Sequence, residues 1–211
     1  TATTAPAGAV PQHTFTGLQA NTTYFFQVSA LNHSYTPTIF VPLGATVTLA
    51  APPASAVSTF SAVVANSFIG AWEGNGNGAG TLYEAVVSTE QAFPNVDLGN
   101  VAVSTRPEGA PSAPFASLSA NTTYYLFARA VNYAGVPTAY TALGATVTLV
   151  NLPATAVTTF TAVTTASLTA AWSANGNGSG TQYSAALSTS TPYPNTSAGN
   201  VVVTTSPAGS P

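Results

Sequence analysis

The sequence predicts an all-β fold built from tandem β-sandwich domains of about 100 residues each. Three observations support this prediction. Segments recur at a fixed spacing of 100 residues, apolar and polar residues alternate with the period of a strand, and clusters of glycine and proline interrupt that alternation. No run of apolar residues follows the period of a helix, so we expect short strands joined by turns.

The repeat is visible in segments that match across the chain. The sequence LGATVTL at 43–49 returns unchanged at 143–149, and LQANTTY at 18–24 returns as LSANTTY at 118–124. A period of this length exceeds that of solenoid repeats, in which each unit is a single layer of a stack. Each unit is therefore predicted to be a complete domain.

Within one period the alternation predicts seven strands, separated by turn residues. The predicted ranges are 56–65, 67–73, 81–89, 99–105, 113–118, 122–132 and 138–149. The glycine-rich run from Gly74 to Gly80 is predicted to be a loop, because glycine favours turns. This run leads into a strand and lacks the lysine and helix of a phosphate-binding loop, so we interpret it as a structural turn.

Four residues of the unit carry a resemblance to a known family. Trp72 lies on the second predicted strand, Tyr83 opens the third, and Leu118 precedes Tyr124 by six residues. In these features the unit resembles a fibronectin type III domain, including those of tandem surface arrays in bacteria and archaea. The resemblance implies an immunoglobulin-like sandwich in which the Leu–Tyr pair forms a tyrosine corner. The family's usual proline between that pair is Ala120 here.

The same hallmark positions recur in the flanking repeats and are expected to belong to their cores. The counterparts are Leu18 and Tyr24 before the middle unit, and Trp172 and Tyr183 after it.

The phase of the repeat divides the chain into one complete domain and two halves. Residues 51–150 form the complete domain, 1–50 correspond to the last three strands of a domain, and 151–211 correspond to the first four. An isolated half would expose apolar side chains and unpaired strand edges. We therefore expect 151–211 to be completed by strands of a neighbouring repeat, either from a second molecule or from the continuation of a longer chain.

Closure of 1–50 onto 151–211 within one chain is disfavoured, because domains of this resemblance place their termini at opposite poles. The two halves together are somewhat longer than one period, so about one strand would be duplicated at the junction.

Charge is scarce, with two basic and five acidic residues and no cysteine. Two cations cannot neutralise a run of phosphates, which argues against binding to nucleic acids or anionic membranes. No apolar stretch is long enough to span a membrane. The only histidines, His13 and His33, lie in the incomplete first segment without an evident nucleophile or acid beside them. We expect no enzyme activity, no cofactor and no metal site.

Two surface features are predicted, a row of aromatic residues on the sixth strand and its counterpart in the first repeat, and an ion pair between the third and sixth strands. Phe25, Tyr125 and Phe127 alternate away from the core series, and a row of aromatic residues can mark an association surface. Lateral packing between arrays, ligand contact and incidental exposure all remain open for this row. Glu84 and Arg129 fall on the outward faces of neighbouring strands and predict a cross-strand ion pair.

Four asparagines begin Asn-x-Ser/Thr triplets and are candidate sites for N-linked glycans: Asn21, Asn32, Asn121 and Asn195. O-linked sugar on the many threonines is an equal alternative.

The sequence predicts an extracellular or cell-surface structural protein. Its repeats would assemble with one another into a filament, stalk or sheath by head-to-tail strand sharing, with glycans as a further candidate partner. The low charge agrees with this, because neighbouring modules with little net repulsion can approach closely. The alternatives are a cell-surface adhesin or binding module using the polar loops around 74–80 or 107–112, and a non-catalytic spacer of a secreted carbohydrate-active enzyme.

Overall fold

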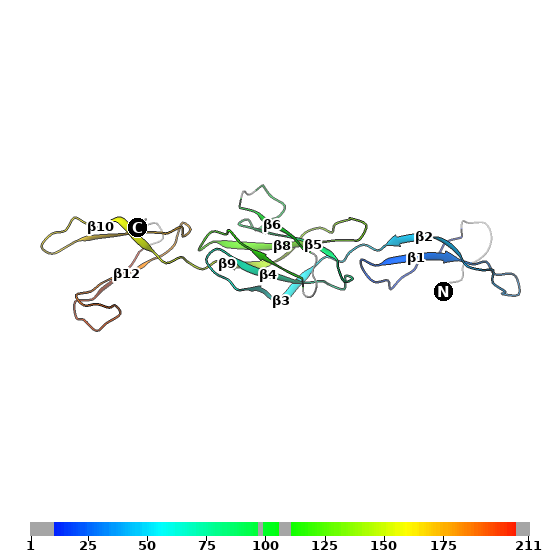
Figure 1. Cartoon of the computed structure of the whole chain (residues 1–211), viewed down its shortest axis with the longest axis horizontal. Helices are drawn as coiled ribbons and strands as arrows, with labels where there is room; N and C mark the ends of the chain where they lie inside the picture. Colours follow the sequence, from blue (N-terminus) through cyan, green and yellow to red (C-terminus); the bar gives the residue numbers. More distant parts are fainter. Residues whose placement is uncertain (1–10, 97–98, 106–110, 206–211) are drawn as a thin grey trace. The chain divides into compact units, whose positions relative to one another are not determined.

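The computed structural model describes residues 11–96, 99–105 and 111–205, and over these ranges the chain forms antiparallel strands and no helix (Figure 1). The predicted all-β class is confirmed. Each of the seven strand ranges predicted for the middle repeat overlaps one observed strand. The alternation of side chains on opposite faces of a strand was therefore a sufficient signal for locating them.

The middle repeat contains two sheets, the arrangement of an immunoglobulin-like, fibronectin type III-like β-sandwich. The three-stranded sheet has the order β3-β4-β7, with β3 at Ala54–Ser61, β4 at Phe68–Glu73 and β7 at Ser112–Phe115. The four-stranded sheet has the order β6-β5-β8-β9, with β6 at Val101–Thr105, β5 at Leu82–Ser88, β8 at Thr123–Val131 and β9 at Thr141–Val147.

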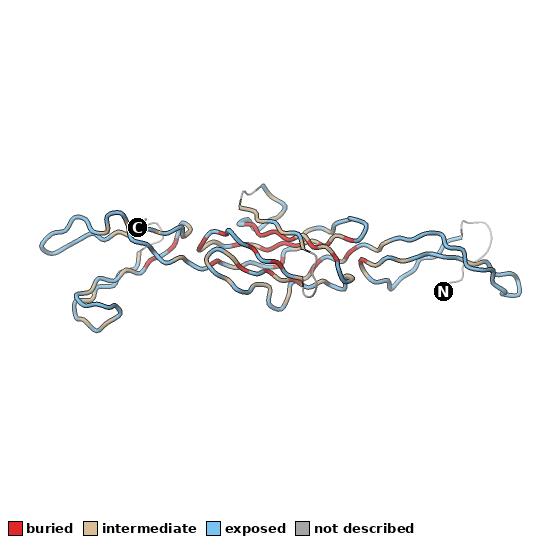
Figure 2. The backbone as a smooth tube through the Cα atoms, in the orientation of Figure 1, coloured by how far each residue is buried: buried red, intermediate tan, exposed pale blue. Residues whose placement is uncertain are grey.

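The flanking repeats contribute three two-stranded antiparallel sheets. The first repeat supplies β1 (Thr23–Val28) paired with β2 (Val41–Val47). The third supplies β10 (Ala154–Thr161) with β11 (Thr169–Ser173), and β12 (Ser184–Leu187) with β13 (Val201–Thr204). Figure 2 shows that buried residues gather in the strands of the middle repeat, whereas most residues of the flanking strands are exposed.

The chain divides into two compact units, and the division crosses the strands of the middle repeat. One unit comprises Thr1–Thr59, Ala71–Ala113 and Leu126–Gly144; the other comprises Phe60–Gly70, Pro114–Tyr125 and Ala145–Pro211. The sheet β1-β2 thus belongs to the first unit, and the strands β10 to β13 belong to the second.

The core of the first unit is built around Trp72 and Tyr83. Their rings pack with centroids 5.9 Å apart, and both side chains are buried. The backbone N–H of Trp72 donates to the carbonyl of Pro111 at 2.9 Å, which ties the end of β4 to the segment that enters β7. Val87 and Leu126 complete this apolar interior.

The core of the second unit is an aromatic cluster centred on Phe68. Its ring lies 5.7 Å from that of Phe115, 6.3 Å from Tyr124 and 5.5 Å from Phe60. The hydroxyl of Tyr124 accepts a hydrogen bond from the backbone N–H of Ser119 at 2.9 Å, the geometry of a tyrosine corner. This bond leaves the ring of Tyr124 in the core while its polar tip is satisfied by the backbone.

The first repeat has the same corner but lacks one expected strand. The hydroxyl of Tyr24 accepts from the N–H of Gln19 at 2.9 Å, as in the middle repeat. Residues 12–15 correspond to β7, yet they form no strand, and Phe15 is 51% exposed where Phe115 is fully buried. In the middle repeat β7 pairs with β4, and the described part of the first repeat has no counterpart of β4 to offer that pairing.

Replacing Leu126 with alanine is expected to lower the free energy of unfolding of the middle repeat by about 2–5 kcal/mol, because a fully buried side chain leaves a cavity. The measurement is denaturant unfolding followed by Trp72 fluorescence in a Trp172→Phe background. Val57→Ala is the matched control: Val57 lies on β3 with its side chain in solvent, so the change should stay within about 0.5 kcal/mol. Equal losses for the two variants would contradict the assigned core.

Candidate functional site

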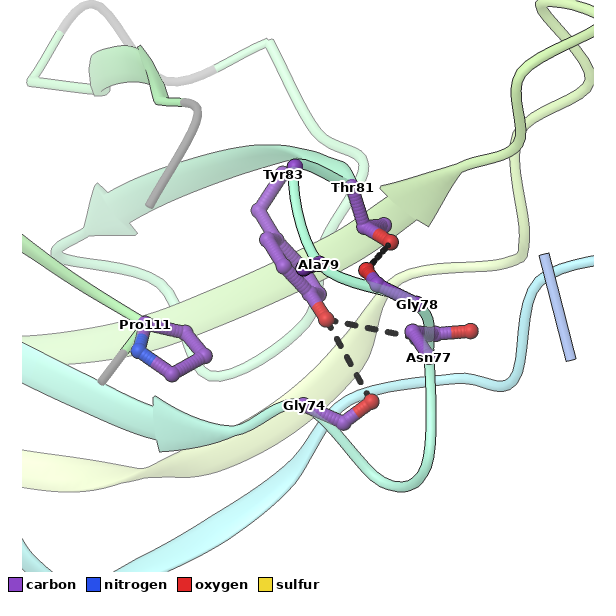
Figure 3. A pocket seen from close by; sticks show the side chains of 8 residues that line it. Gly74, Asn77, Gly78, Ala79, Thr81, Tyr83 and Pro111 are labelled. Atoms are coloured by element: carbon purple, nitrogen blue, oxygen red, sulfur yellow. Dashed lines mark hydrogen bonds between the residues drawn. The ribbon is translucent and has the colours of Figure 1, made fainter. Parts of the chain in front are cut away.

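The glycine-rich loop between β4 and β5 lines a small hollow within the first unit, at the end of the middle repeat that adjoins the first repeat (Figure 3). Backbone bonds from Asn77 N to Gly74 O and from Thr81 N to Gly78 O close two successive turns at 3.1 and 3.3 Å. The hollow has a volume of about 130 Å³. Pockets for small organic ligands are typically about 300–1,000 Å³, so this one is not sized for such a ligand.

Tyr83 closes the base of the hollow and fixes the loop. Its hydroxyl lies 3.3 Å from the carbonyl oxygen of Gly74, to which it donates, and 3.3 Å from Nδ2 of Asn77, from which it accepts (Figure 3). Burial raises the pKa of Tyr83, which outweighs the lowering by the Asn77 hydrogen bond. Tyr83 therefore stays a neutral hydrogen-bonding group at physiological pH, and no feature of it indicates a catalytic role.

Asn77 reaches from the loop to the connection between the first and middle repeats. Its Nδ2 donates to the carbonyl of Ala51 at 2.8 Å, and its Oδ1 accepts from the N–H of Ala51 at 2.7 Å. Asn75 adds a bond from its Nδ2 to the carbonyl of Pro52 at 2.9 Å. The amide of Asn77 thus bonds both the N–H and the carbonyl of Ala51, which belongs to no strand. Half-buried backbone groups outside strands need such partners.

The same clamp recurs one period later, inside the second unit. Asn177 exchanges two hydrogen bonds with the backbone of Asn151, at 2.6 and 3.0 Å, and Asn175 donates to the carbonyl of Leu152 at 2.9 Å. The Asn-Gly-Asn-Gly sequence that we interpreted as a structural turn is therefore more than a turn. It holds the connection to the preceding repeat.

A second asparagine, Asn21, joins the first half-repeat to two loops of the middle repeat. Its side chain is fully buried. Nδ2 donates to Oγ1 of Thr81 at 2.7 Å, and Oδ1 accepts from the backbone N–H of Tyr133 at 2.7 Å. Gly78 lies close to this joint: a Cβ at that position would lie 3.2 Å from the carbonyl oxygen of Asn21, closer than ordinary van der Waals contact.

Asn132 completes this joint from the loop between β8 and β9. Its Nδ2 donates to the carbonyl of Thr48 at 3.2 Å, and its Oδ1 accepts from the N–H groups of Ala134 and Val136. The hydroxyl of Tyr133 donates to the carbonyl of Ala79. Two loops of the middle repeat thus close around the end of the first.

The joint between the middle and third repeats uses the counterpart residues. Nδ2 of Asn121 donates to Oγ1 of Thr181 at 2.7 Å, and the N–H of Gly178 donates to the carbonyl of Ala120 at 3.0 Å. A Cβ on Gly178 would lie 3.0 Å from the carbonyl oxygen of Asn121. Both joints therefore depend on the same asparagine, threonine and glycine positions.

The joints involve two of the candidate glycan sites. The amide nitrogens of Asn21 and Asn121 each donate to a threonine hydroxyl within a joint, and their assignment as glycan sites stays a prediction. Nδ2 of Asn195 donates within its own loop, to Oγ of Ser188 and the carbonyls of Ser190 and Pro192. Asn32 is exposed, and no hydrogen bond from its Nδ2 is found among the described residues.

The three aromatic residues predicted as a surface row have different environments. Phe25 is 82% exposed and Tyr125 is half-buried. Phe127 is only 4% exposed, which corrects its assignment to a lateral interface. The loop after β5 folds over it, so that the ring of Phe93 stacks on Phe127 at 5.5 Å and meets Tyr140 edge-on at 4.7 Å.

Glu84 and Arg129 form the expected ion pair across β5 and β8, with both side chains about one-third exposed. The guanidinium also lies 4.6 Å from the centre of the Tyr140 ring. Burial raises the pKa of Tyr140, and the neighbouring Arg129 opposes that rise. An ion pair this accessible to water contributes under about 1 kcal/mol to stability. Its position agrees with the pairing of β5 with β8.

The remaining sequence predictions concern the polar loop around 107–112, metal sites and membrane-spanning segments. Most of the polar loop around 107–112 lies outside those residues. In 11–96, 99–105 and 111–205, no group of three His, Cys, Asp or Glu side chains gathers where it could hold a metal ion. The described part of the chain also contains no helix long and apolar enough to cross a membrane.

No family model matches this chain, and no curated protein matches it. A crystal structure of the FN1–FN3 domains of chicken CNTN1 is similar at 17% identity with a TM-score of 0.36. The similarity covers 65% of this chain and 46% of the contactin fragment, so the chain matches about half of that fragment's length. At this level of similarity, nothing about binding or activity transfers from that protein.

Replacing Asn77 with alanine should release the connection at Ala51, because the N–H of Ala51 loses its acceptor. We expect amide hydrogen exchange at Ala51, measured by NMR, to be about fivefold faster or more, as follows from losing a hydrogen bond worth about 1 kcal/mol or more. Asn177→Ala is the matched control, since it frees Asn151 and leaves Ala51 protected. Unchanged exchange at Ala51 in the Asn77 variant would show that the clamp does not hold the connection.

Proposed function

We propose that this chain is an extracellular structural protein whose repeats join head to tail into a filament, stalk or sheath. In this proposal each half-repeat is completed by strands of a neighbouring repeat, so the principal partner is the protein itself. The role of the chain is mechanical and does not involve catalysis.

The observation that carries the proposal is that equivalent positions are buried in the complete repeat and exposed in the first half-repeat. Leu126, Ala128 and Leu143 are at most 4% exposed. Their counterparts Phe26, Val28 and Leu43 are 46%, 45% and 59% exposed. These positions lie on β1 and β2, which carry the sequence of a core-facing sheet without the layer that would cover it.

The third repeat shows the complementary exposure on β12 and β13. Leu187 is 47% exposed, whereas its counterpart Val87 in β5 is completely buried. Val201 and Val203 are 56% and 54% exposed. In the middle repeat β5 lies between β6 and β8, so the missing neighbour of β12 is a counterpart of β8. β1 is such a counterpart, and a second chain can supply it.

Substitutions between the repeats support the fit of the two halves. The middle repeat buries Phe68 and Leu126. A composite repeat made from 151–205 and the 11–50 segment of another chain would hold Leu168 and Phe26 at those positions. One phenylalanine and one leucine are present in either case, so the summed side-chain volume at these two positions is unchanged.

Charge shows the same compensation. The ion pair of Glu84 and Arg129 would be replaced in the composite repeat by Ser184 and Ser29. Both charges are absent together, so the composite repeat contains no unpaired charge at this half-buried position.

Disulfide crosslinking between Ser29→Cys and Ser184→Cys tests strand sharing directly. The equivalent side chains, Glu84 and Arg129, form an ion pair between the adjacent strands β5 and β8. Opposed residues of adjacent antiparallel strands have Cα atoms about 4.5–5.5 Å apart, which is within the range of a disulfide. The chain has no cysteine of its own, so every crosslink comes from the engineered pair. Oxidation of the double variant is expected to give a ladder of covalent multimers on a non-reducing gel.

The matched control pairs Ser29→Cys with Ser167→Cys, because Ser167 lies in the exposed turn that joins β10 to β11. A ladder of equal intensity from the control would mean that the multimers arise from random collision. A crosslinked species with the mass of one chain would mean that the two halves close within a single molecule. Either result would contradict head-to-tail sharing between chains.

A further inference from the structure

We infer that the loop at 31–37 of a second copy docks on the middle repeat of the first copy, with Asn32 and His33 bonding to Thr148 and Asn121. This inference rests on the proposed function and extends it. Strand sharing places the second copy against the third repeat, whereas the docking loop adds a separate polar contact to the repeat before it.

The intact joint in the first unit shows what such a contact looks like. The loop between β8 and β9 places two donors against the end of the preceding repeat. The N–H of Tyr133 bonds to Oδ1 of Asn21 at 2.7 Å, and Nδ2 of Asn132 bonds to the carbonyl of Thr48 at 3.2 Å. The loop between β4 and β5 provides the other half of that joint through Thr81.

The second joint has only one of these two halves. Thr181 bonds to Nδ2 of Asn121, just as Thr81 bonds to Asn21. Oδ1 of Asn121 and the carbonyl of Thr148 are the two acceptors that correspond to Asn21 and Thr48. Among the described residues no hydrogen bond reaches either acceptor.

The first repeat presents the missing loop in the conformation that the joint requires. Oδ1 of Asn32 accepts from the N–H groups of Ser34 and Thr36, both at 2.9 Å. The equivalent bonds of Asn132 are 3.0 and 2.8 Å. Residue 35 has a φ of 61°, close to the 79° of Gly135 at the equivalent position.

This match has two consequences for binding. The turn is closed by its own hydrogen bonds before any partner arrives, so docking does not have to order it. Oδ1 of Asn32 is used inside the turn, which leaves Nδ2 as the group that can reach a partner, and the whole loop from residue 31 to 37 is exposed. The residue after the asparagine is Tyr133 in the middle repeat and His33 in the first repeat. This difference removes neither proposed donor, because one is Nδ2 of Asn32 and the other is the backbone N–H of His33.

The partner is a second copy because both sides of the contact are repeat counterparts of an observed contact. The two donors are the counterparts of Asn132 Nδ2 and the Tyr133 N–H, and the two acceptors are the counterparts of the Thr48 carbonyl and Asn21 Oδ1. All four groups are neutral, so the contact should vary little with ionic strength.

Asn32→Asp tests the docking loop. Aspartate keeps the oxygen that closes the turn, removes the Nδ2 donor, and places a carboxylate against the carbonyl of Thr148. We expect self-association, measured by sedimentation velocity over a concentration series, to weaken about tenfold or more, as for a lost hydrogen bond that leaves an unsatisfied polar group. The matched control is Asn132→Asp, which makes the same change in the internal joint and should leave the association constant within twofold.

A second measurement uses the unmodified chain and does not depend on a variant. Exchange of the His33 amide hydrogen should slow at least tenfold on association, because that N–H gains Oδ1 of Asn121 as an acceptor. If the chain associates while the His33 amide stays unprotected and Asn32→Asp has no effect, strand sharing stands and the docking loop is wrong. If the unmodified chain does not associate at all, both the proposed function and the docking loop are overturned.

Discussion

Apolar sheet faces must be covered, and the arrangement of the strands in this structure depends on that requirement. A face of valine, leucine and phenylalanine gains stability only where a second layer keeps it from water. The middle repeat provides that layer within one chain, and its counterpart positions stay near zero exposure. The half-repeats carry the same residues without the layer. Their sequence matches that of the middle repeat, and under the proposed function the covering layer comes from a neighbouring repeat.

The joints between repeats satisfy a second requirement, which concerns polar groups. The connections at Ala51 and Asn151 lie outside any strand pairing, so their backbone groups need other partners. Asparagine suits this role because a primary amide donates and accepts at the same time and carries no charge. A chain in which 3% of residues are charged can therefore hold its repeats in register without salt bridges at the joints. At each joint a loop packs closely on the backbone of the preceding repeat. Gly78 lies against the carbonyl of Asn21, and Gly178 lies against the carbonyl of Asn121.

The sequence was sufficient for the strands and insufficient for the joints. Alternation located all seven strands of the middle repeat, and it also identified Glu84 and Arg129 as cross-strand neighbours. The partners of Asn21 and Asn77 lie 60 and 26 residues away, and no local pattern encodes contacts at that range. The available signal was that Asn21 and Thr81 both recur exactly one period later. Phe127 was assigned to the outer surface because alternation reports a strand face and says nothing about a loop, here carrying Phe93, that folds over it.

Sedimentation equilibrium of the unmodified chain over a wide concentration range tests the central claim most directly, because it asks whether the exposed faces are covered by another chain. We expect a weight-average mass that rises continuously with concentration past that of a dimer, because under the proposed function the exposed strands of 11–50 and of 151–205 pair with different neighbouring chains. Binding of a hydrophobic dye should fall in parallel. A mass that stays at that of one chain throughout, with dye binding per chain unchanged, would contradict the claim.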